Sequence, residues 1–170
     1  MKIKYSLSGA QVEEIISWLY QEWKEKGSSF YLNQNKIEKS YEEGRILGYE
    51  NNNTLIGFLT WEECSNESGL YISLDIMAIH PGYRRKGIGE KFYKLAENYF
   101  FEREAIAVKL FCSPMESEPF WKAMGFQKYP DTGYAEHPLT YYKPLIEHNR
   151  STLDLTSDRL ELQGKRIINI

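Results

Sequence analysis

The chain has 170 residues, with 42% hydrophobic and 15% aromatic residues and a formal net charge of −3. This length corresponds to one ordinary domain with a sizeable core, and the composition excludes a disordered chain. The slight negative charge argues against nucleic-acid binding, which needs a broad basic surface, and no apolar run approaches the roughly 20 residues of a membrane span.

The N-terminal residues and the two cysteines indicate the compartment and the state of the thiols. The first residues carry no apolar stretch of the kind found in signal peptides, so we expect a cytoplasmic location. Cys64 and Cys112 are too few for a disulfide framework or a zinc site, so each is expected to be a buried free thiol and no metal is expected.

The first half of the chain is expected to form a strand, two helices and a β-hairpin. Residues 2–7 alternate as a short strand does, and Ser8 or Gly9 can open a helix. Apolar residues at helical spacing then define one expected buried face: Val12, Ile15, Ile16, Leu19 and Trp23. A weaker helix over 34–44 precedes two strands, 45–50 and 54–63, joined by an asparagine turn at 51–53.

The second half is expected to alternate strands and helices. A strand over 70–79, with both faces mostly buried, leads through a loop into an amphipathic helix that starts near Ile88. Then follow a strand over 105–111, a short helix capped by Ser117 and ended by Gly125, and strands over 126–129 and 139–145. The resulting order, βααβββαβαββ, predicts an α/β fold whose sheet is covered by helices on both faces.

The loop between the strand at 70–79 and the following helix reads HPGYRRKGIG, residues 80–89. A glycine-containing loop at a helix N-terminus presents free backbone N–H groups and the positive end of the helix dipole, and here Arg84, Arg85 and Lys86 add side-chain cations. Gly87 and Gly89 have no Cβ, so a diphosphate could approach their amides closely. The loop therefore favours phosphate binding, the alternative being a solvated basic turn that caps the helix. The patterns of a P-loop and of a dinucleotide-binding loop do not fit.

Two motifs in this order resemble those of the GNAT superfamily of N-acetyltransferases. Arg84-x-x-Gly87-x-Gly89 resembles the acetyl-CoA-binding motif of that superfamily, and FWKAMGF at 120–126 resembles its second helix–strand junction. The resemblance implies a GNAT-type domain over residues 1–146, with a mixed, largely antiparallel sheet. It also implies a splayed V between the strands at 70–79 and 105–112.

The same resemblance implies the cofactor and the reaction. Acetyl-CoA would lie in the V as cosubstrate, with its diphosphate on the amides of residues 85–89, Ile88 among them, and with no metal involved. Backbone amides near Met77 and Ile79 would hold the pantetheine and polarise the thioester carbonyl. The acceptor, a primary amine, would attack the thioester directly in a ternary complex.

The reaction needs a base, and Asp75 is the candidate because it is a carboxylate in an otherwise apolar strand. The alternative is an ion pair, with Lys109 as one possible partner. His80 and His137 are lesser candidates for the base. Tyr134 could donate a proton, as could Tyr141 and Tyr142, although tyrosines next to a strand usually serve packing. Cys112 is expected to be a core thiol and not a nucleophile.

Trp121 stands at the position where the family often has a general-acid tyrosine, and an indole cannot act as that acid. A non-catalytic acyl-CoA-binding module, or an interaction protein, on the same fold therefore remains an alternative. The region of the first two helices offers four aromatic residues that could wall an acceptor pocket, although most of them are expected to be core: Trp18, Trp23, Phe30 and Tyr31.

Residues 147–170 extend beyond the expected domain, and apolar residues alternate in them. They are expected to form two or three short strands that pack on the domain or on a second subunit of a homodimer, because such strands are not stable alone in water. A mobile tail is the alternative.

Overall fold

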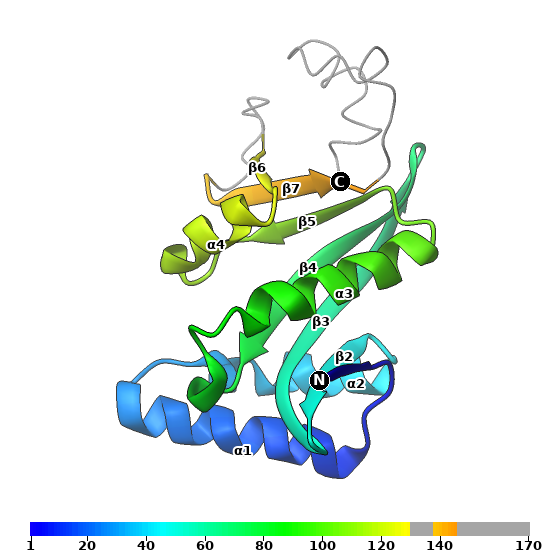
Figure 1. Cartoon of the computed structure of the whole chain (residues 1–170). Helices are drawn as coiled ribbons and strands as arrows, with labels where there is room; N and C mark the ends of the chain where they lie inside the picture. The colour runs from blue at the N-terminus through cyan, green and yellow to red at the C-terminus, as the bar shows by residue number, and fades with distance from the viewer. Residues whose placement is uncertain (130–137, 146–170) are drawn as a thin grey trace. The chain divides into compact units, whose positions relative to one another are not determined.

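The computed structural model describes residues 1–129 and 138–145, and its elements follow the predicted order (Figure 1). The strands are β1 (Lys2–Lys4), β2 (Ile46–Asn51), β3 (Thr54–Asn66), β4 (Gly69–Ile79), β5 (Ala107–Phe111), β6 (Gln127–Lys128) and β7 (Thr140–Pro144). The α-helices are α1 (Gly9–Lys26), α2 (Gln34–Glu42), α3 (Ile88–Glu102) and α4 (Glu118–Ala123). The short 3₁₀ helices are η1 (Phe30–Asn33), η2 (Pro81–Tyr83) and η3 (Met115–Ser117).

Local chemistry accounts for the ends of α1. Ser8 is its N-cap, and the Ser8 hydroxyl and the Gln11 side chain form a reciprocal capping box. Gly27, at φ 71°, ends the helix in the left-handed conformation that glycine adopts without a steric penalty. The predicted start of this helix is therefore confirmed.

The β2–β3 hairpin turns at Asn52 and Asn53, whose φ values are 48° and 64°. Asparagine tolerates this left-handed region better than most residues, which is why the asparagine run predicted the turn correctly. The pairing shifts register after Tyr49, so that Tyr49 lies opposite Gly57 and Glu50 opposite Leu55. Ile56 is the extra residue of this bulge.

The strands are hydrogen-bonded in the order β1-β2-β3-β4-β5-β7-β6. The pairs β1–β2, β2–β3, β5–β7 and β6–β7 are antiparallel, whereas β4 and β5 are parallel, with Tyr71–Leu74 opposite Ala107–Leu110. The predicted α/β fold with a mixed, largely antiparallel sheet is confirmed.

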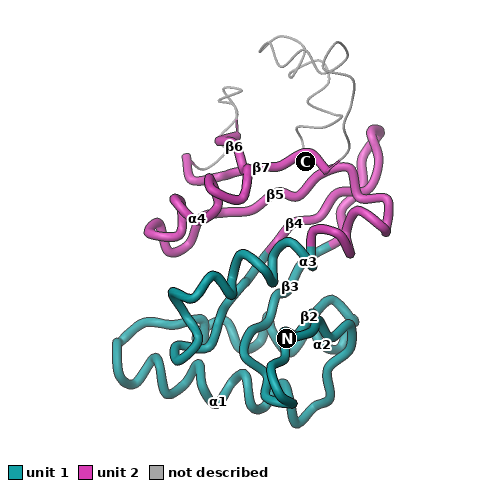
Figure 2. Tube along the Cα trace, viewed as in Figure 1, with its two compact units in different colours: residues 1–62, 75–96 teal, residues 63–74, 97–170 magenta. Residues whose placement is uncertain are grey.

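The chain divides into two compact units, residues 1–62 with 75–96 and residues 63–74 with 97–170, as Figure 2 shows in two colours. The first contains α1, α2, β1, β2, most of β3, the end of β4 and the start of α3. The second contains β5, β7, α4 and the remaining parts of β3, β4 and α3. The V expected between β4 and β5 would involve residues of both units, and it stays a prediction.

In the first unit, helices cover both faces of the strands. Ile46 of β2 belongs to a buried cluster with side chains of α1 and α2, including Leu19 and Ile37. Tyr49, which is three residues along and therefore on the other face, stacks on Phe92 of α3 with ring centroids 4.9 Å apart. The helices thus exclude water from both sides of β2 and position the end of β4 and the loop that follows it.

In the second unit, buried aromatic side chains surround β5 and β7. Trp121 of α4 packs edge-to-face on Phe126, with ring centroids 5.3 Å apart, and Tyr129 packs in the same way on Tyr142, 5.8 Å apart. The hydroxyl of Tyr141 in β7 donates a hydrogen bond to Glu118 and thereby joins the short helix α4 to this strand.

Three predicted details are wrong. Ser117 precedes α4, but its side chain makes no capping hydrogen bond. The α1 helix is rotated about its axis relative to the expected face, because Trp18 and Glu22 are buried while Ile16 and Trp23 are only half-buried. In β4, alternate residues from Tyr71 to Met77 are half-buried instead of buried, so one face of this strand is less covered than predicted.

Candidate functional site

The loop from His80 to Gly89 joins β4 to α3 within the first unit. Its first turn is η2, where Nδ1 of His80 accepts a hydrogen bond of 3.2 Å from the backbone N–H of Gly82. Two left-handed residues follow, Arg85 at φ 63° and Gly87 at φ 70°. The helix α3 begins directly afterwards, and the N–H of Lys91 donates to the carbonyl oxygen of Gly87 at 3.2 Å.

This geometry leaves a continuous row of backbone donors. Among the residues that the structure describes, the N–H groups of residues 85–89 have no hydrogen-bond acceptor. Left-handed residues between ordinary ones curve a backbone so that successive N–H groups converge, which is a recurrent anion-binding arrangement. The positive end of the α3 dipole lies at the same place. Residues 85–89, which we call the phosphate-binding loop, thus combine donors unpaired among the described residues and a helix N-terminus, the features of an anion-binding arrangement.

The three cations of the motif are used differently. Arg84 is engaged with Glu22 of α1 and with the carbonyl oxygen of Ile79. Lys86 donates to the carbonyl oxygen of Gly82 at 2.9 Å, so its charge is turned back on the loop. Arg85 is exposed and makes no hydrogen bond or ion pair within the described ranges, which leaves its guanidinium available to an outside anion.

Space for an anion exists at Gly87. A Cβ added there would meet no atom within 4 Å, and its φ of 70° is a conformation that residues with side chains rarely adopt. The absence of a side chain at this position keeps the approach to the amides open.

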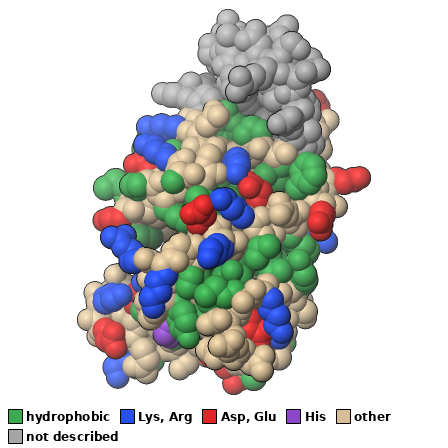
Figure 3. Space-filling model, in the orientation of Figure 1, with side chains coloured by type: hydrophobic (Ala, Val, Ile, Leu, Met, Phe, Trp, Pro, Cys, Tyr) green, Lys and Arg blue, Asp and Glu red, His purple; other side chains and the backbone are tan. Residues whose placement is uncertain are grey.

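On the face that Figure 3 draws, basic and acidic side chains are interspersed, in keeping with the small net charge.

The strand β4 carries the remaining candidates of this unit. Ile79 is buried and Met77 half-buried, and the N–H of His80 donates to the carbonyl oxygen of Ile56 at 2.9 Å. The His80 ring packs edge-to-face on Trp18, with centroids 5.5 Å apart. His80 therefore has a structural task as a cap of η2 and as a packing partner of α1.

Asp75 forms an ion pair with Lys36 of α2, in which Nζ lies 2.6 Å from Oδ1, and the Asp75 side chain is only 9% exposed. The ion pair that was the alternative to a catalytic role is therefore present, but the partner of Asp75 is Lys36 and not the suggested Lys109. The other carboxylate oxygen, Oδ2, is buried and has no hydrogen-bond partner among the described residues.

Burial raises the pKa of Asp75 above its ordinary value, although the hydrogen bond from Lys36 and its charge act in the opposite direction. The charge of Glu62 raises this pKa further, while that of Arg45 lowers it. A carboxylate with a raised pKa and a free oxygen is more basic than an exposed one, and such groups are over-represented at functional sites.

The candidates for nucleophile and acid that lie in the second unit are packed in its interior. Cys112 is a buried free thiol as expected, whereas the free thiol Cys64 is only half-buried, contrary to the prediction. Burial, followed by the nearby charge of Glu118, raises the pKa of Cys112, so it is not a thiolate nucleophile. Tyr141 is buried and donates its hydroxyl hydrogen to Glu118, while burial raises the pKa of Tyr142. Trp121 is 6% exposed and packed among aromatic rings.

The aromatic residues of the first two helices divide into two groups. Trp18 is core and packs on Phe58 with ring centroids 5.9 Å apart. Trp23 and Tyr31 instead form a half-buried cluster with the exposed ring of Tyr20.

Some expected features lie outside the described residues, namely His137, Tyr134 and the C-terminal extension 147–170. Within the part of the chain that the structure describes, no group of three or more His, Cys, Asp or Glu side chains could hold a metal ion. No helix in the described ranges has both the length and the apolar character needed to cross a membrane.

Sequence reasoning missed two charged residues beside the candidate site, Glu22 and Lys36. Glu22 follows Leu19 by three positions and Ile15 by seven, so helical spacing places it among apolar residues. A carboxylate in an apolar stripe is a signal that could have identified it. Lys36 gives no such signal, because it is one of several charged residues in the short helix α2.

Comparison with known proteins agrees with this geometry. The family model of the Acetyltransferase (GNAT) family matches residues 10–126. Among curated proteins, none matches the sequence. More than two thirds of the chain thus matches a family model.

Solved structures share the fold. The PaiA N-acetyltransferase from Thermoplasma acidophilum, in complex with coenzyme A, is 23% identical, with 85% of this chain and 99% of that chain covered and a TM-score of 0.59. Ard1 from Thermoplasma volcanium is 18% identical, with 86% and 98% covered and a TM-score of 0.64. The N-acetyltransferase YlbP from Bacillus subtilis, in complex with coenzyme A, is 15% identical, with 84% and 95% covered and a TM-score of 0.56. With the family model matched over most of the domain, the chain belongs to the GNAT family of acetyltransferases.

Proposed function

We propose that the protein is an acetyl-CoA-dependent N-acetyltransferase that transfers the acetyl group to a primary amine. The observation that carries the proposal is the row of backbone N–H groups at residues 85–89, which have no partner among the described residues, at the start of α3. Coenzyme A carries a diphosphate, which is the kind of anion that such a row binds. Family membership makes acetyl-CoA the natural source of that diphosphate.

The side chains of the loop add selectivity for an anion. Arg85 is the cation best placed to pair with an outlying phosphate, because Arg84 and Lys86 already have partners in the protein. Met77 and Ile79 precede the loop on β4, and their backbone groups are proposed to hold the pantetheine and the thioester carbonyl.

The reaction is proposed to be a direct transfer. The amine nitrogen attacks the carbonyl carbon of the thioester, the C–N bond forms, and the C–S bond breaks as the electron pair leaves with the sulfur. The nitrogen then loses a proton to give the amide, and this proton passes to the departing thiolate or to solvent. The ammonium form of the acceptor must first lose a proton, and Asp75 is proposed to accept it, directly or through water. The raised pKa of Asp75 supports this role, as does Oδ2, which has no hydrogen-bond partner among the described residues.

A second candidate function is acyl-CoA binding without catalysis. The ion pair between Lys36 and Asp75 favours it, because a base whose oxygen is already paired with a cation is less able to take a proton. The indole of Trp121 at the family's tyrosine position also favours it.

Calorimetric titration with acetyl-CoA, followed by an assay of thiol release against a panel of primary amines, separates the candidates. Binding with turnover on at least one amine supports the transferase. Binding with no turnover on any amine supports the binding module. Absence of acetyl-CoA binding contradicts both functions.

The C-terminal extension, residues 147–170, is proposed to pack on the domain or on a second copy of the chain, and the protein is proposed to act in the cytoplasm. Ending the chain at Leu145 should then expose apolar surface, so the protein should lose an oligomer or aggregate. Unchanged size and solubility by light scattering would contradict the packing proposal.

A further inference from the structure

Glu22 is a buried carboxylate on the core-facing side of α1. It is only 6% exposed, and Ile15, Trp18 and Leu19 of the same helix are buried with it. Burial of a carboxylate is costly unless cations and hydrogen-bond donors compensate for the lost water. A specific partner is therefore needed to explain its place.

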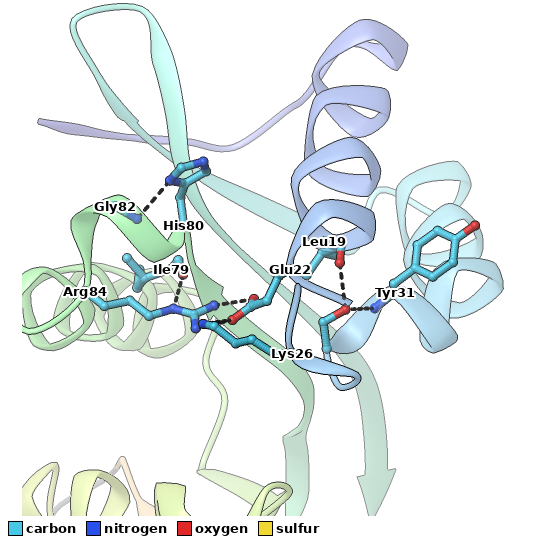
Figure 4. A network of polar contacts seen from close by, with 9 residues as sticks. Leu19, Glu22, Lys26, Tyr31, Ile79, His80, Gly82 and Arg84 are labelled. Carbon is cyan, nitrogen blue, oxygen red and sulfur yellow. Dashed lines mark hydrogen bonds and ion pairs between the residues drawn. The ribbon is translucent and has the colours of Figure 1, made fainter. Parts of the chain in front are cut away.

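The partner is Arg84, which is the first residue of the motif and comes directly before the phosphate-binding loop (Figure 4). The two carboxylate oxygens of Glu22 accept separate hydrogen bonds from the terminal nitrogens of Arg84, at 2.5 and 2.7 Å. The third nitrogen, Nε, donates to the carbonyl oxygen of Ile79 at 2.6 Å. Lys26 also donates to Glu22, at 2.9 Å. Every nitrogen of the guanidinium is thus used within the protein.

These bonds join three segments: α1, the end of β4, and the start of the loop. The helix α1 is far from the other two in the sequence. The bidentate geometry fixes the orientation of the guanidinium as well as its position. Arg84 therefore acts as a tether whose anchor on α1 is Glu22, 62 positions away in the chain.

The tether ends next to the strained part of the loop. Arg85, the following residue, has φ 63° without being a glycine, and residues with a side chain rarely adopt this left-handed conformation because it is sterically unfavourable. Strain of this kind persists only when the surroundings hold it. The hydrogen bond from Lys91 to Gly87 at the start of α3 holds the far side of the loop. Arg84 holds the near side.

We propose that Glu22 is a positioning residue for the cofactor: through Arg84 it keeps residues 85–89 in the conformation in which their N–H groups converge on the diphosphate. The inference rests on the proposed function, because it assumes that coenzyme A binds at this loop. Without Glu22 the loop would sample other conformations, and binding would have to restore the productive one. Affinity should fall even though Glu22 does not contact the cofactor.

The first test is calorimetric titration of coenzyme A into Glu22→Gln, which keeps the size of the side chain and removes its charge. The dissociation constant should rise about tenfold. Glu50→Gln is the matched control, because Glu50 is a glutamate of the same unit, 5% exposed and paired with Lys2 at 3.3 Å. The control should bind coenzyme A within about twofold of the wild type. Arg84→Lys keeps the charge but loses the bidentate geometry, so it should also weaken binding of coenzyme A. This variant replaces Glu22→Gln in the titration if Glu22→Gln does not fold.

The second test compares acetyl donors with and without the diphosphate. With acetyl-CoA, Glu22→Gln should lose about tenfold in kcat/KM, mostly through KM. With S-acetylpantetheine, which lacks the diphosphate, the variant should match the wild type within about twofold. An equal loss with both donors would overturn the inference, because it would indicate general damage to the fold.

Failure of the inference is distinct from failure of the proposed function. If the wild type binds coenzyme A and Glu22→Gln binds it equally well or more tightly, Arg84 does not act as a tether and the inference is wrong. If the wild type itself does not bind coenzyme A, the proposed function is wrong and the inference falls with it.

Discussion

The ammonium of Lys36 lies 2.6 Å from one carboxylate oxygen of Asp75 and thereby joins α2 to β4. The second oxygen of Asp75 is buried and has no hydrogen-bond partner in the described part of the chain. The carboxyl thus combines a structural ion pair with a free acceptor, and the two features favour different roles. Substitutions at these two residues can separate the roles.

Asp75→Asn keeps the shape of the side chain and removes its basicity. If Asp75 is the base, kcat should fall by roughly 10²- to 10⁴-fold while affinity for acetyl-CoA stays unchanged, because the cofactor is proposed to bind at the loop. Steady-state kinetics and calorimetry measure the two quantities. Full specific activity together with a lowered melting temperature would show that Asp75 has only a structural role.

The pH dependence of kcat/KM should report the raised pKa of Asp75. Because burial raises this pKa, the activity should decline on the acid side at a pH above the ~3.9 of an ordinary aspartate. Lys36 lowers the pKa, so Lys36→Met should move the acid limb to still higher pH, while Glu62 and Arg45 act equally in both proteins. An acid limb at the same pH in both proteins would exclude Asp75 as the titrating group.

Gly87→Asp should weaken acetyl-CoA binding by at least tenfold, about 1.4 kcal/mol, because a carboxylate would stand against the diphosphate. Gly44→Asp is the matched control. Its φ of 68° is close to the 70° of Gly87, and a Cβ at either position meets no atom within 4 Å. Both variants carry the same backbone strain, so both should lose similar thermal stability.

Calorimetric titration of acetyl-CoA into the two glycine variants tests whether the diphosphate binds at the loop. Only the variant at Gly87 should lose affinity for acetyl-CoA. Equal affinities in both would mean that the diphosphate does not bind at the phosphate-binding loop.

Trp121→Tyr tests whether the missing family tyrosine limits the reaction. The leaving group is a thiol, and if its pKa resembles the ~8.5 of cysteine, the thiolate can depart without an acid at neutral to mildly alkaline pH. We therefore expect little gain in kcat from Trp121→Tyr and a kcat within about tenfold of the wild type for Trp121→Phe. A gain of roughly 10²-fold or more from a nearly inactive parent would instead support the non-catalytic binding module.

The ion pair between Glu22 and Arg84 should contribute stability that disappears at low pH. Burial alone would raise the pKa of Glu22, but hydrogen bonds from Arg84 and Lys26 outweigh it, and the pKa lies below its ordinary value. A carboxyl with a lowered pKa stabilises the fold above its unfolded pKa of about 4.3 and loses this effect as the pH falls through the folded value.

Urea unfolding at a series of pH values measures this contribution. Because Arg84 is partly exposed, we expect Glu22→Gln to cost on the order of 2 kcal/mol at pH 7, between the values for exposed and buried pairs. The difference from the wild type should shrink below about pH 4. A difference that stays constant down to pH 3 would show that the charge of Glu22 is not what stabilises the fold.

Much of the fold could be predicted from the sequence because its signals are local. Ser8 caps α1, two asparagines turn the hairpin, and Gly125 follows the end of α4 at φ 88°, each through chemistry within a few residues. The loop that carries the motif was predicted for the same reason, since glycines after a strand and before a helix define its backbone. Where the prediction depended on a side chain finding a partner, as for the hydroxyl of Ser117, it was wrong.

The sequence by itself determined the order of the elements and the family, because periodicity, caps and motif glycines act within short stretches of chain. Only the tertiary structure decided which charges meet. It paired Asp75 with Lys36 and directed Arg84 to Glu22, which leaves Arg85 as the cation of the motif without a partner in the described residues. Ion pairs form between segments that packing brings together, and their partners follow from helix rotation and strand register. A linear pattern does not contain that information.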